Sequence, residues 1–149
     1  MADDRFWDPI AEERESGLQR LLGYRIVAWE DGFAAVCLDL KPHHMNRSGV
    51  LHGGVVATML DAVGGLTGLY CPVPGHVRKA VSISLNINFV GQARDQTVRA
   101  EARKIGGGRK IFFARGECLA ADGSLIATAE GSYRYRSGSE DSAGIPRED

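Results

Sequence analysis

Apolar and polar residues alternate most regularly between residues 81 and 89 of this 149-residue chain. Val, Ile, Leu, Ile and Phe occupy the odd positions of that run, and Ser and Asn fill the even ones. A period of two is typical of a strand with one buried face. Two earlier apolar runs meet at Glu30-Asp31-Gly32, and an Asp-Gly step between such runs predicts a hairpin.

Further strands are predicted in the C-terminal half, each bounded by a turn signal. Two apolar runs, roughly 97–105 and 109–120, flank Gly106-Gly107-Gly108. A last run, LIATAEGSYRYR, follows the Asp-Gly step of ADGS. Because consecutive strands joined by short turns pair antiparallel, these runs predict a meander.

Two helices are predicted, one on each side of the first hairpin. Asp8-Pro9 is typical of a helix start and Gly23 of a helix end, so we expect a helix over 9–22. A longer and strongly apolar helix is expected over 53–70, between two loop signals.

This element order predicts an α+β fold. One antiparallel sheet wrapped around the long central helix, with an extra N-terminal helix, accommodates every predicted element. Residues 1–136 are expected to form a single domain. The polar segment 137–149 has little apolar surface to bury, and we expect it to be disordered.

Composition and charge exclude several classes of function. A formal net charge of -1 gives no broad attraction to nucleic acid or to an anionic membrane surface. The chain has neither a signal peptide at its start nor a run of the roughly 20 apolar residues that spans a bilayer, which predicts a cytoplasmic protein. The three cysteines form no Cys-x-x-Cys pair and are expected to be reduced thiols packed as small hydrophobes.

The segment NRSGVLHGGVVATMLDAVGG, residues 46–65, departs from an ordinary buried helix. At helical spacing, one face carries small residues and a single carboxylate: Ala57, Asp61, Gly64 and Gly68. That face leaves room for a second helix or a thin ligand. The opposite side is apolar and is expected to face the sheet: Val56, Met59, Leu60, Val63 and Leu66.

Each unusual residue of this segment has a plain structural interpretation and a functional one. Asp61 could point into solvent or pair with an arginine, but its apolar neighbours also suit a catalytic base. Gly53 and Gly54 could shape a turn, or they could let a ligand oxygen approach the free N–H groups at the helix start. His52 alone is more often a packing residue, and Asn46 alone a turn residue.

Spacing constrains any shared chemistry. Gly53 and Asp61 are eight residues apart, which is about 12 Å of helix rise, so both cannot touch one carbonyl carbon from the same helix. Two antiparallel copies of the helix across a two-fold axis would bring Asp61 of one subunit beside Gly53 of the other. We therefore expect an active site that belongs to a dimer.

The same segment resembles the signature of hotdog-fold acyl-CoA thioesterases of the phenylacetate-pathway (PaaI-like) type. The resemblance extends over roughly residues 20–136 and includes SISLNINFVGQA and GSYRYR. It implies an enzyme that hydrolyses a thioester to free acid and coenzyme A, and at least a homodimer, with a homotetramer expected. Gly53 N–H and Asn46 would polarise the thioester carbonyl, while Asp61 of the partner subunit would activate water or attack directly. Ser82 would orient the water, and His52 would hold the shape of the site.

Coenzyme A is part of the substrate, and its phosphates need basic partners. The candidates near loop signals are Arg78, Lys79, Arg94, Arg109 and Lys110. Gly54, Arg109 and Lys110 are predicted to bind substrate, although GGGRK is more often simply a glycine-rich hairpin. The four histidines lack ligand spacing, so we expect neither a metal nor a redox cofactor.

Two other functions are kept open. A non-catalytic acyl-CoA-binding or sensing module needs no buried base, and a hotdog hydratase or dehydratase fits the spacing of Gly53 and Asp61 poorly. Aryl, hydroxyaryl and medium-chain acyl groups all fit the sequence.

Overall fold

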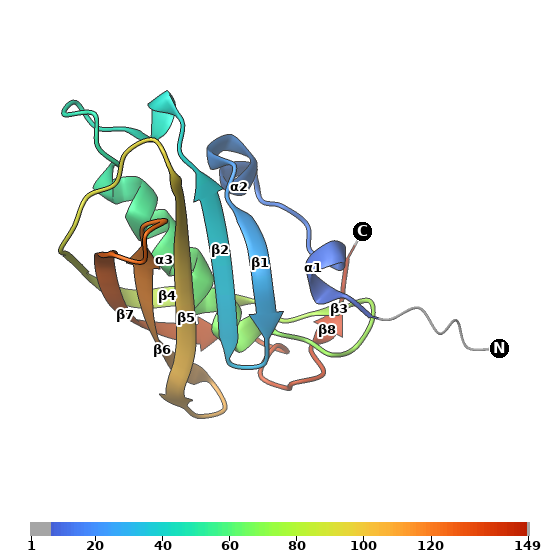
Figure 1. Cartoon of the computed structure of the whole chain (residues 1–149). Coiled ribbons are helices and arrows are strands. Elements are labelled where there is room, and N and C mark those ends of the chain that lie inside the picture. The colour runs from blue at the N-terminus through green and yellow to red at the C-terminus, as the bar shows by residue number, and fades with distance from the viewer. Residues whose placement is uncertain (1–6, 149) are drawn as a thin grey trace.

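The computed structural model describes residues 7–148 and places one long helix against one antiparallel sheet (Figure 1). The helix is α3 (Gly53–Leu69), and its 17 residues follow the apolar run predicted for this position. The predicted α+β architecture, a sheet wrapped around a central helix, is confirmed.

The sheet has six strands in the order β1-β2-β5-β6-β7-β4, and every neighbouring pair is antiparallel. The hairpin at Asp31-Gly32 and the turn at Asp122-Gly123 lie where the sequence predicts them. β4 is an edge strand, because it pairs only with β7. The strands are β1 (Arg25–Glu30), β2 (Phe33–Asp39), β4 (Ala80–Phe89), β5 (Thr97–Gly107), β6 (Ile111–Leu119) and β7 (Leu125–Tyr135).

The apolar side of α3 faces the sheet as predicted. Val56, Met59, Leu60 and Val63 are buried and pack in one cluster with inward residues of β2, β5 and β7. Leu66, expected on the same side, is only half-buried and packs at the margin of that cluster.

The small-residue face of α3 differs from its prediction. Ala57 and Asp61 are half-exposed, but Gly64 and Gly68 are buried. A Cβ at Gly64 would overlap the phenol oxygen of Tyr133, and one at Gly68 would overlap the ring of Phe112. The space beside these two glycines is therefore filled by two aromatic rings of the protein's own sheet, and a second helix cannot pack there.

The predicted N-terminal helix is two helices. α1 (Pro9–Glu12) ends where Glu13 adopts an extended conformation, and α2 (Gly17–Leu22) begins after a new cap at Ser16. The Ser16 Oγ accepts a hydrogen bond from Gln19 N–H at 3.1 Å, which satisfies a free donor of the first turn. A single helix over 9–22 was wrong because Ser16 stabilises a second start.

Residues 137–148 have a defined course instead of the predicted disorder. β8 (Ile145–Pro146) pairs antiparallel with β3 (His76–Val77). Ser139 is fully buried, and its Oγ accepts a hydrogen bond from Lys79 N–H at 2.8 Å. The side chains of this segment are mostly polar, but its backbone forms hydrogen bonds with β3. Residue 149 lies outside the described residues.

β4 does not bury the face that its alternation predicts. Val81, Ile83 and Phe89 are 42%, 54% and 56% exposed, and only Leu85 and Ile87 pack on the core. A β-bulge between Ser82 and Ser84 shifts the register of β4 against β7. Since a bulge moves the following side chains to the other face, Ser82 lies on the same side as Leu85 and Ile87.

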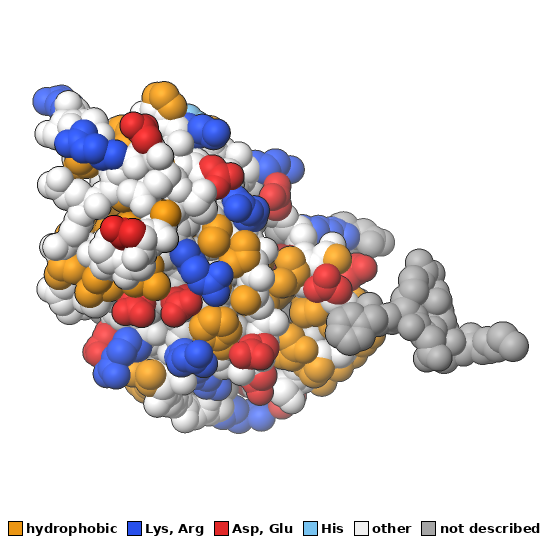
Figure 2. Space-filling view, viewed as in Figure 1, with side chains coloured by type: hydrophobic (Ala, Val, Ile, Leu, Met, Phe, Trp, Pro, Cys, Tyr) orange, Lys and Arg blue, Asp and Glu red, His pale blue; other side chains and the backbone are white. Residues whose placement is uncertain are grey.

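On the face of the molecule seen in Figure 2, Lys and Arg side chains are interspersed with Asp and Glu side chains. Within residues 7–148, no helix is long and apolar enough to cross a membrane.

Candidate active site

A carboxylate and a hydroxyl meet between the middle of α3 and the edge strand β4. Ser82 Oγ donates a hydrogen bond of 2.6 Å to Asp61 Oδ1. Asp61 is half-buried, so its other oxygen can still meet a ligand or water. The structure thus brings together two of the predicted site residues that are distant in sequence.

A cavity of about 230 Å³ opens beside this pair, and we call it the site cavity. Its remaining lining is mainly apolar where α3, β1 and the start of β4 form it: Ile26, Ala62, Gly65, Leu66, Leu69 and Ala80. Glu13, Gln19, Tyr24 and Tyr133 add polar groups to the rest of the wall. An apolar wall beside a carboxylate suits a ligand whose reacting end is polar and whose remainder is not.

Two phenols face Asp61 from the same cavity. Burial raises the pKa of Tyr133, and the negative charge of Asp61 raises it further. Burial is also the main cause that raises the pKa of Tyr24, with Asp61 adding to it. Both tyrosines therefore stay protonated at neutral pH. Sequence reasoning missed them, because their place beside Asp61 depends on β1 and β7 packing against α3.

The start of α3 presents a second set of predicted residues. His52 is the N-cap, and its Nδ1 accepts a hydrogen bond from Gly54 N–H at 2.8 Å. Gly53 N–H has no acceptor within the described part of the chain. A free N–H at the positive end of a 17-residue helix is suited to binding a carbonyl oxygen that gains negative charge.

Asn46 shapes the loop that leads into α3. Its side-chain oxygen accepts hydrogen bonds from Ser48 N–H at 2.9 Å and Val50 N–H at 3.2 Å. Arg94 Nη1 donates to the carbonyl oxygens of Ser48 and Gly49, at 3.2 and 2.8 Å. Because the side-chain oxygen of Asn46 already accepts these two hydrogen bonds, Asn46 can bind a ligand through its amide N–H₂ group.

Within one chain these two sets of residues remain apart. α3 is uninterrupted from Gly53 to Leu69, so the rise between Gly53 and Asp61 is about 12 Å. The structure places Ser82 with Asp61, and Asn46 beside His52, the residue before Gly53. It does not bring the two sets together in a single subunit.

Some of the basic residues predicted to bind coenzyme A are already bonded to groups of the protein, and others line a surface hollow. Arg109 pairs with Asp141 at 3.0 Å, and Arg78 donates to the carbonyl oxygens of Ser139 and Glu140. Arg94 binds the loop after Asn46, as described above. Lys79 and Lys110 instead line one surface hollow together with Arg134 and Arg136. Arg134 and Arg136 were not singled out from the sequence.

The cysteines take no part in the candidate site. Cys71 and Cys118 are buried and Cys37 is half-buried, and none of the three forms a disulfide. Burial raises the pKa of the Cys118 thiol to about 12, which makes it a poor nucleophile. Within residues 7–148, no group of three or more His, Cys, Asp or Glu side chains is arranged to hold a metal ion.

Comparison with known families and structures identifies relatives of this fold. The family profile described as the thioesterase superfamily matches residues 48–127, which include Gly53, Asp61 and Ser82. The chain is 27% identical to the medium/long-chain acyl-CoA thioesterase YigI of Salmonella typhimurium, over 76% of this chain and 82% of that protein.

Two solved structures are similar over most of the chain. The conserved protein PA5202 of Pseudomonas aeruginosa superposes with a TM-score of 0.73 and 28% identity, covering 82% of this chain and 95% of that one. The PaaI protein of Escherichia coli, from the phenylacetic acid degradation operon, gives a TM-score of 0.72 at 20% identity, over 83% of this chain and 87% of that one. At that identity the likeness to PaaI supports the fold.

Proposed function

Because the chain belongs to the thioesterase superfamily and has its hotdog fold, we propose that it is an acyl-CoA thioesterase. The observation that carries this proposal is the hydrogen bond between Ser82 and Asp61 beside a mainly apolar cavity. The similarity to YigI, whose name specifies medium and long-chain acyl-CoA, supports the same class of substrate.

In the proposed reaction, the thioester carbonyl oxygen accepts hydrogen bonds from Gly53 N–H and the amide of Asn46. Asp61 accepts a proton from water as the water oxygen attacks the carbonyl carbon, and Ser82 holds the carboxylate in place. The carbon–sulfur bond then breaks, and the thiolate of coenzyme A leaves and takes up a proton. The products are a carboxylic acid and free coenzyme A. Direct attack by Asp61 is the variant of this scheme that proceeds through an anhydride.

The proposed site is completed by a second copy of the chain. Gly53 and Asp61 of one subunit are about 12 Å apart along α3, so the two groups that act on one carbonyl must come from two subunits. The free edge of β4 carries exposed apolar side chains at Val81, Ile83 and Phe89, which a partner at that edge would cover. We propose a dimer formed there, and a tetramer as the complete assembly.

The remaining parts of the proposal concern coenzyme A and the compartment. Lys79, Lys110, Arg134 and Arg136 form the basic hollow that we assign to the phosphates, whereas Arg109 is engaged with Asp141. The three unpaired cysteines fit a reducing compartment, and we place the activity in the cytoplasm.

The test is a thiol-release assay over a panel of acyl-CoA thioesters, with the Asp61→Asn variant beside the wild type. We expect the variant to lose a factor on the order of 10² or more in kcat, because the carboxamide keeps the shape but not the base. Asp31→Asn, the same change in an exposed turn, is the control and should retain full activity.

Two results would redirect the proposal. Turnover of Asp61→Asn close to wild type would remove Asp61 from the chemistry. Tight binding of acyl-CoA by the wild type without any thiol release would favour the non-catalytic binding module.

A further inference from the structure

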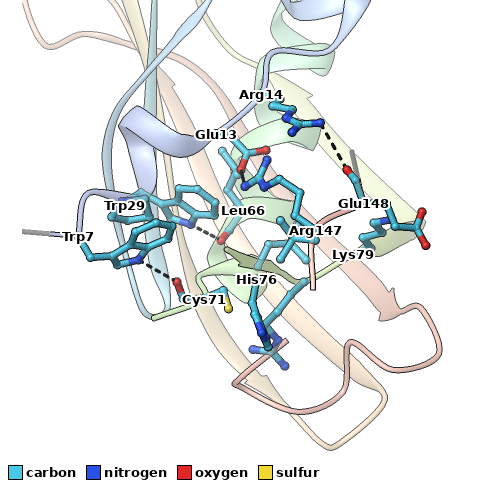
Figure 3. Close-up of a pocket in the computed structure, with 14 residues that line it drawn as sticks. Trp7, Glu13, Arg14, Trp29, Leu66, Cys71, His76, Lys79, Arg147 and Glu148 are labelled. Carbon is cyan, nitrogen blue, oxygen red and sulfur yellow. Dashed lines mark hydrogen bonds and ion pairs between the residues drawn. The ribbon is translucent and has the colours of Figure 1, made fainter. Parts of the chain in front are cut away.

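A second cavity lies next to the site cavity at the C-terminal end of α3, and we call it the terminal cavity (Figure 3). Its volume is about 370 Å³, and the two cavities share Glu13, Leu66 and Leu69 as lining residues. A ligand that lies beside Asp61 can therefore extend past Leu66 without leaving the protein surface.

The route between the two cavities follows one stripe of α3. Asp61, Ala62, Gly65, Leu66 and Leu69 all line it, and these are the half-exposed positions of this part of the helix. Apart from Asp61 their side chains are apolar or absent. From Asp61 to Leu69 the helix rises about 12 Å, which matches an extended alkyl chain of roughly eight to ten carbons.

Aromatic side chains form one end of the terminal cavity. Trp29 Nε1 donates to the carbonyl oxygen of Leu66 at 2.8 Å, and Trp7 Nε1 donates to that of Cys71 at 3.4 Å. With both N–H groups bonded to the backbone, what the indoles can offer a ligand is their apolar surface. Figure 3 shows the two indoles at the same end of the cavity, near Cys71.

The two ends of the chain close the terminal cavity together. Arg147 forms an ion pair with Glu13 at 3.7 Å, and Arg14 Nη1 donates to the carbonyl oxygen of Glu148 at 3.4 Å. Arg78, the third arginine of the lining, is bonded to the carbonyl oxygens of Ser139 and Glu140. Because each arginine has a partner within the chain, these three side chains are poorly placed to bind the phosphates of coenzyme A. Lys79 also lines the terminal cavity, and it is shared with the basic hollow assigned to the phosphates.

We propose that the site cavity and the terminal cavity together bind the acyl group of the substrate, and that this group is an unbranched medium-chain acyl group. The thioester lies at Asp61, the chain follows Ala62, Gly65 and Leu66, and its methyl end reaches Trp7 and Trp29. This inference rests on the proposed thioesterase function and adds the substrate class and the residues that select it.

Kinetics of a Leu66→Trp variant test the route, because Leu66 lines both cavities and a larger ring there blocks the passage. The measured quantity is the ratio of kcat/KM for decanoyl-CoA to that for butyryl-CoA. We expect wild type to favour decanoyl-CoA and Leu66→Trp to lower the ratio by about tenfold or more, since each buried methylene adds to binding. Leu21→Trp, the same substitution at an exposed position of α2 that lines neither cavity, should leave the ratio unchanged.

A ratio that Leu66→Trp leaves unchanged would overturn the proposal, as would a wild type that prefers butyryl-CoA or phenylacetyl-CoA. Binding provides a readout that does not depend on turnover. The only two tryptophans of the chain, Trp7 and Trp29, both line the terminal cavity, so intrinsic fluorescence reports on its occupant.

The fluorescence experiment uses the Asp61→Asn variant, which we expect to bind substrate and to hydrolyse it at about one hundredth of the wild-type rate or less. Decanoyl-CoA should change the tryptophan emission, whereas butyryl-CoA and free coenzyme A should change it little. An equal response to free coenzyme A would place the nucleotide in the terminal cavity and overturn the proposal. If wild type hydrolyses none of the thioesters while decanoyl-CoA alone changes the emission, the proposed catalysis fails and the acyl site stands.

Discussion

The contact between Ser82 and Asp61 depends on one irregularity in β4. In a regular strand, successive side chains point to opposite faces, so Ser82 would point away from the face on which Leu85 and Ile87 pack against the core. The bulge between Ser82 and Ser84 turns Ser82 toward α3, and its hydroxyl then reaches Asp61 at 2.6 Å. Bulges are common beside active sites because they redirect a side chain in this way.

Removing this hydroxyl should affect turnover more than binding. For Ser82→Ala we expect kcat to fall by about 10 to 100-fold with little change in KM, because the carboxylate loses the group that orients it. The free energy of unfolding should change by less than about 0.5 kcal/mol, since Ser82 is exposed. Steady-state kinetics on a medium-chain acyl-CoA and a urea titration measure the two quantities.

Ser84→Ala is the matched control for Ser82→Ala, two residues along the same strand and also exposed. It should keep wild-type kinetics. Ser82→Thr, which retains the hydroxyl, should recover much of the lost kcat. An equal loss in Ser84→Ala would show that the effect comes from β4 itself and not from the contact with Asp61.

Sequence reasoning singled out the residues of the candidate site, but it predicted little of their surroundings. Asp61 and Gly53 followed from their places in an apolar helix and at its start. Ser82 was predicted from the family resemblance alone, because the alternation of β4 gave no sign of a bulge. The hydrogen bonds from Arg94 to the loop after Asn46, and the positions of Tyr24 and Tyr133, depend on contacts between elements that are distant along the chain.

At the scale of elements, the glycines of α3 determine how closely the helix approaches the sheet. Tyr133 and Phe112 lie against Gly64 and Gly68, and their rings stack with centroids 5.1 Å apart. Glycine costs about 1 kcal/mol relative to alanine in a helix interior. The close contact with two aromatic rings explains why the helix has glycine rather than alanine at these two positions.

Adjacent glycines of α3 should therefore respond in opposite ways to alanine. We expect Gly64→Ala to lower the free energy of unfolding by about 1–3 kcal/mol, because the new methyl group overlaps Tyr133. Gly65→Ala should raise it by up to about 1 kcal/mol, since its nearest neighbour would be 3.8 Å away in ordinary contact. Chemical denaturation of both variants gives the comparison.

A second substitution identifies the cause of the difference. Tyr133→Phe removes the oxygen that lies nearest to the added methyl group, so Gly64→Ala should cost less in that background. If Gly64→Ala is as stable as Gly65→Ala, Tyr133 has room to move and the packing argument is wrong.

The N-terminal region shows where element prediction failed. The start signal at Asp8-Pro9 and the end signal at Gly23 favoured one helix over 9–22, whereas the structure has a break at Glu13–Ser16. A serine followed three residues later by a glutamine is a helix-start signal, and Ser16 and Gln19 carry it. The extended backbone at Glu13 is stabilised by the ion pair with Arg147, a contact across the whole chain that local sequence cannot predict.

At the scale of the whole molecule, both ends of the chain take part in one structure. α1 lies beside β3 and β8 in Figure 1, and the ion pair between Glu13 and Arg147 joins the two ends. The segment 137–148 was expected to be disordered because it is polar. Its order comes from backbone pairing and from the buried Ser139, neither of which needs apolar side chains.

The proposed dimer allows a direct test of the shared site by mixing two inactive variants. Asp61→Asn and Asn46→Ala are each expected to be weak alone, because both sites of a homodimer carry the same defect. After joint unfolding and refolding, about half of the dimers are heterodimers, and each has one intact site and one doubly altered site. Because one site in each heterodimer is intact, about a quarter of all sites are intact, and the mixture should recover about a quarter of wild-type thiol release.

Mass measurement of the refolded mixture establishes that heterodimers form. If Asn46 and Asp61 served one site within a single subunit, every site would still carry a defect and mixing would restore nothing. Confirmed heterodimers without recovered activity would exclude the site shared between subunits.

The strand order β1-β2-β5-β6-β7-β4 also sets the order in which a ribosome can complete the sheet. β4 is synthesised before β5, β6 and β7, but its partner within the chain is β7, the last strand of the sheet to emerge. Until Leu125–Tyr135 has left the ribosome, both edges of β4 are open and its core-facing residues Leu85 and Ile87 have no complete core to pack on. The sheet is therefore completed only by its C-terminal strand, and until then β4 is an unpaired strand of the kind that is prone to aggregate.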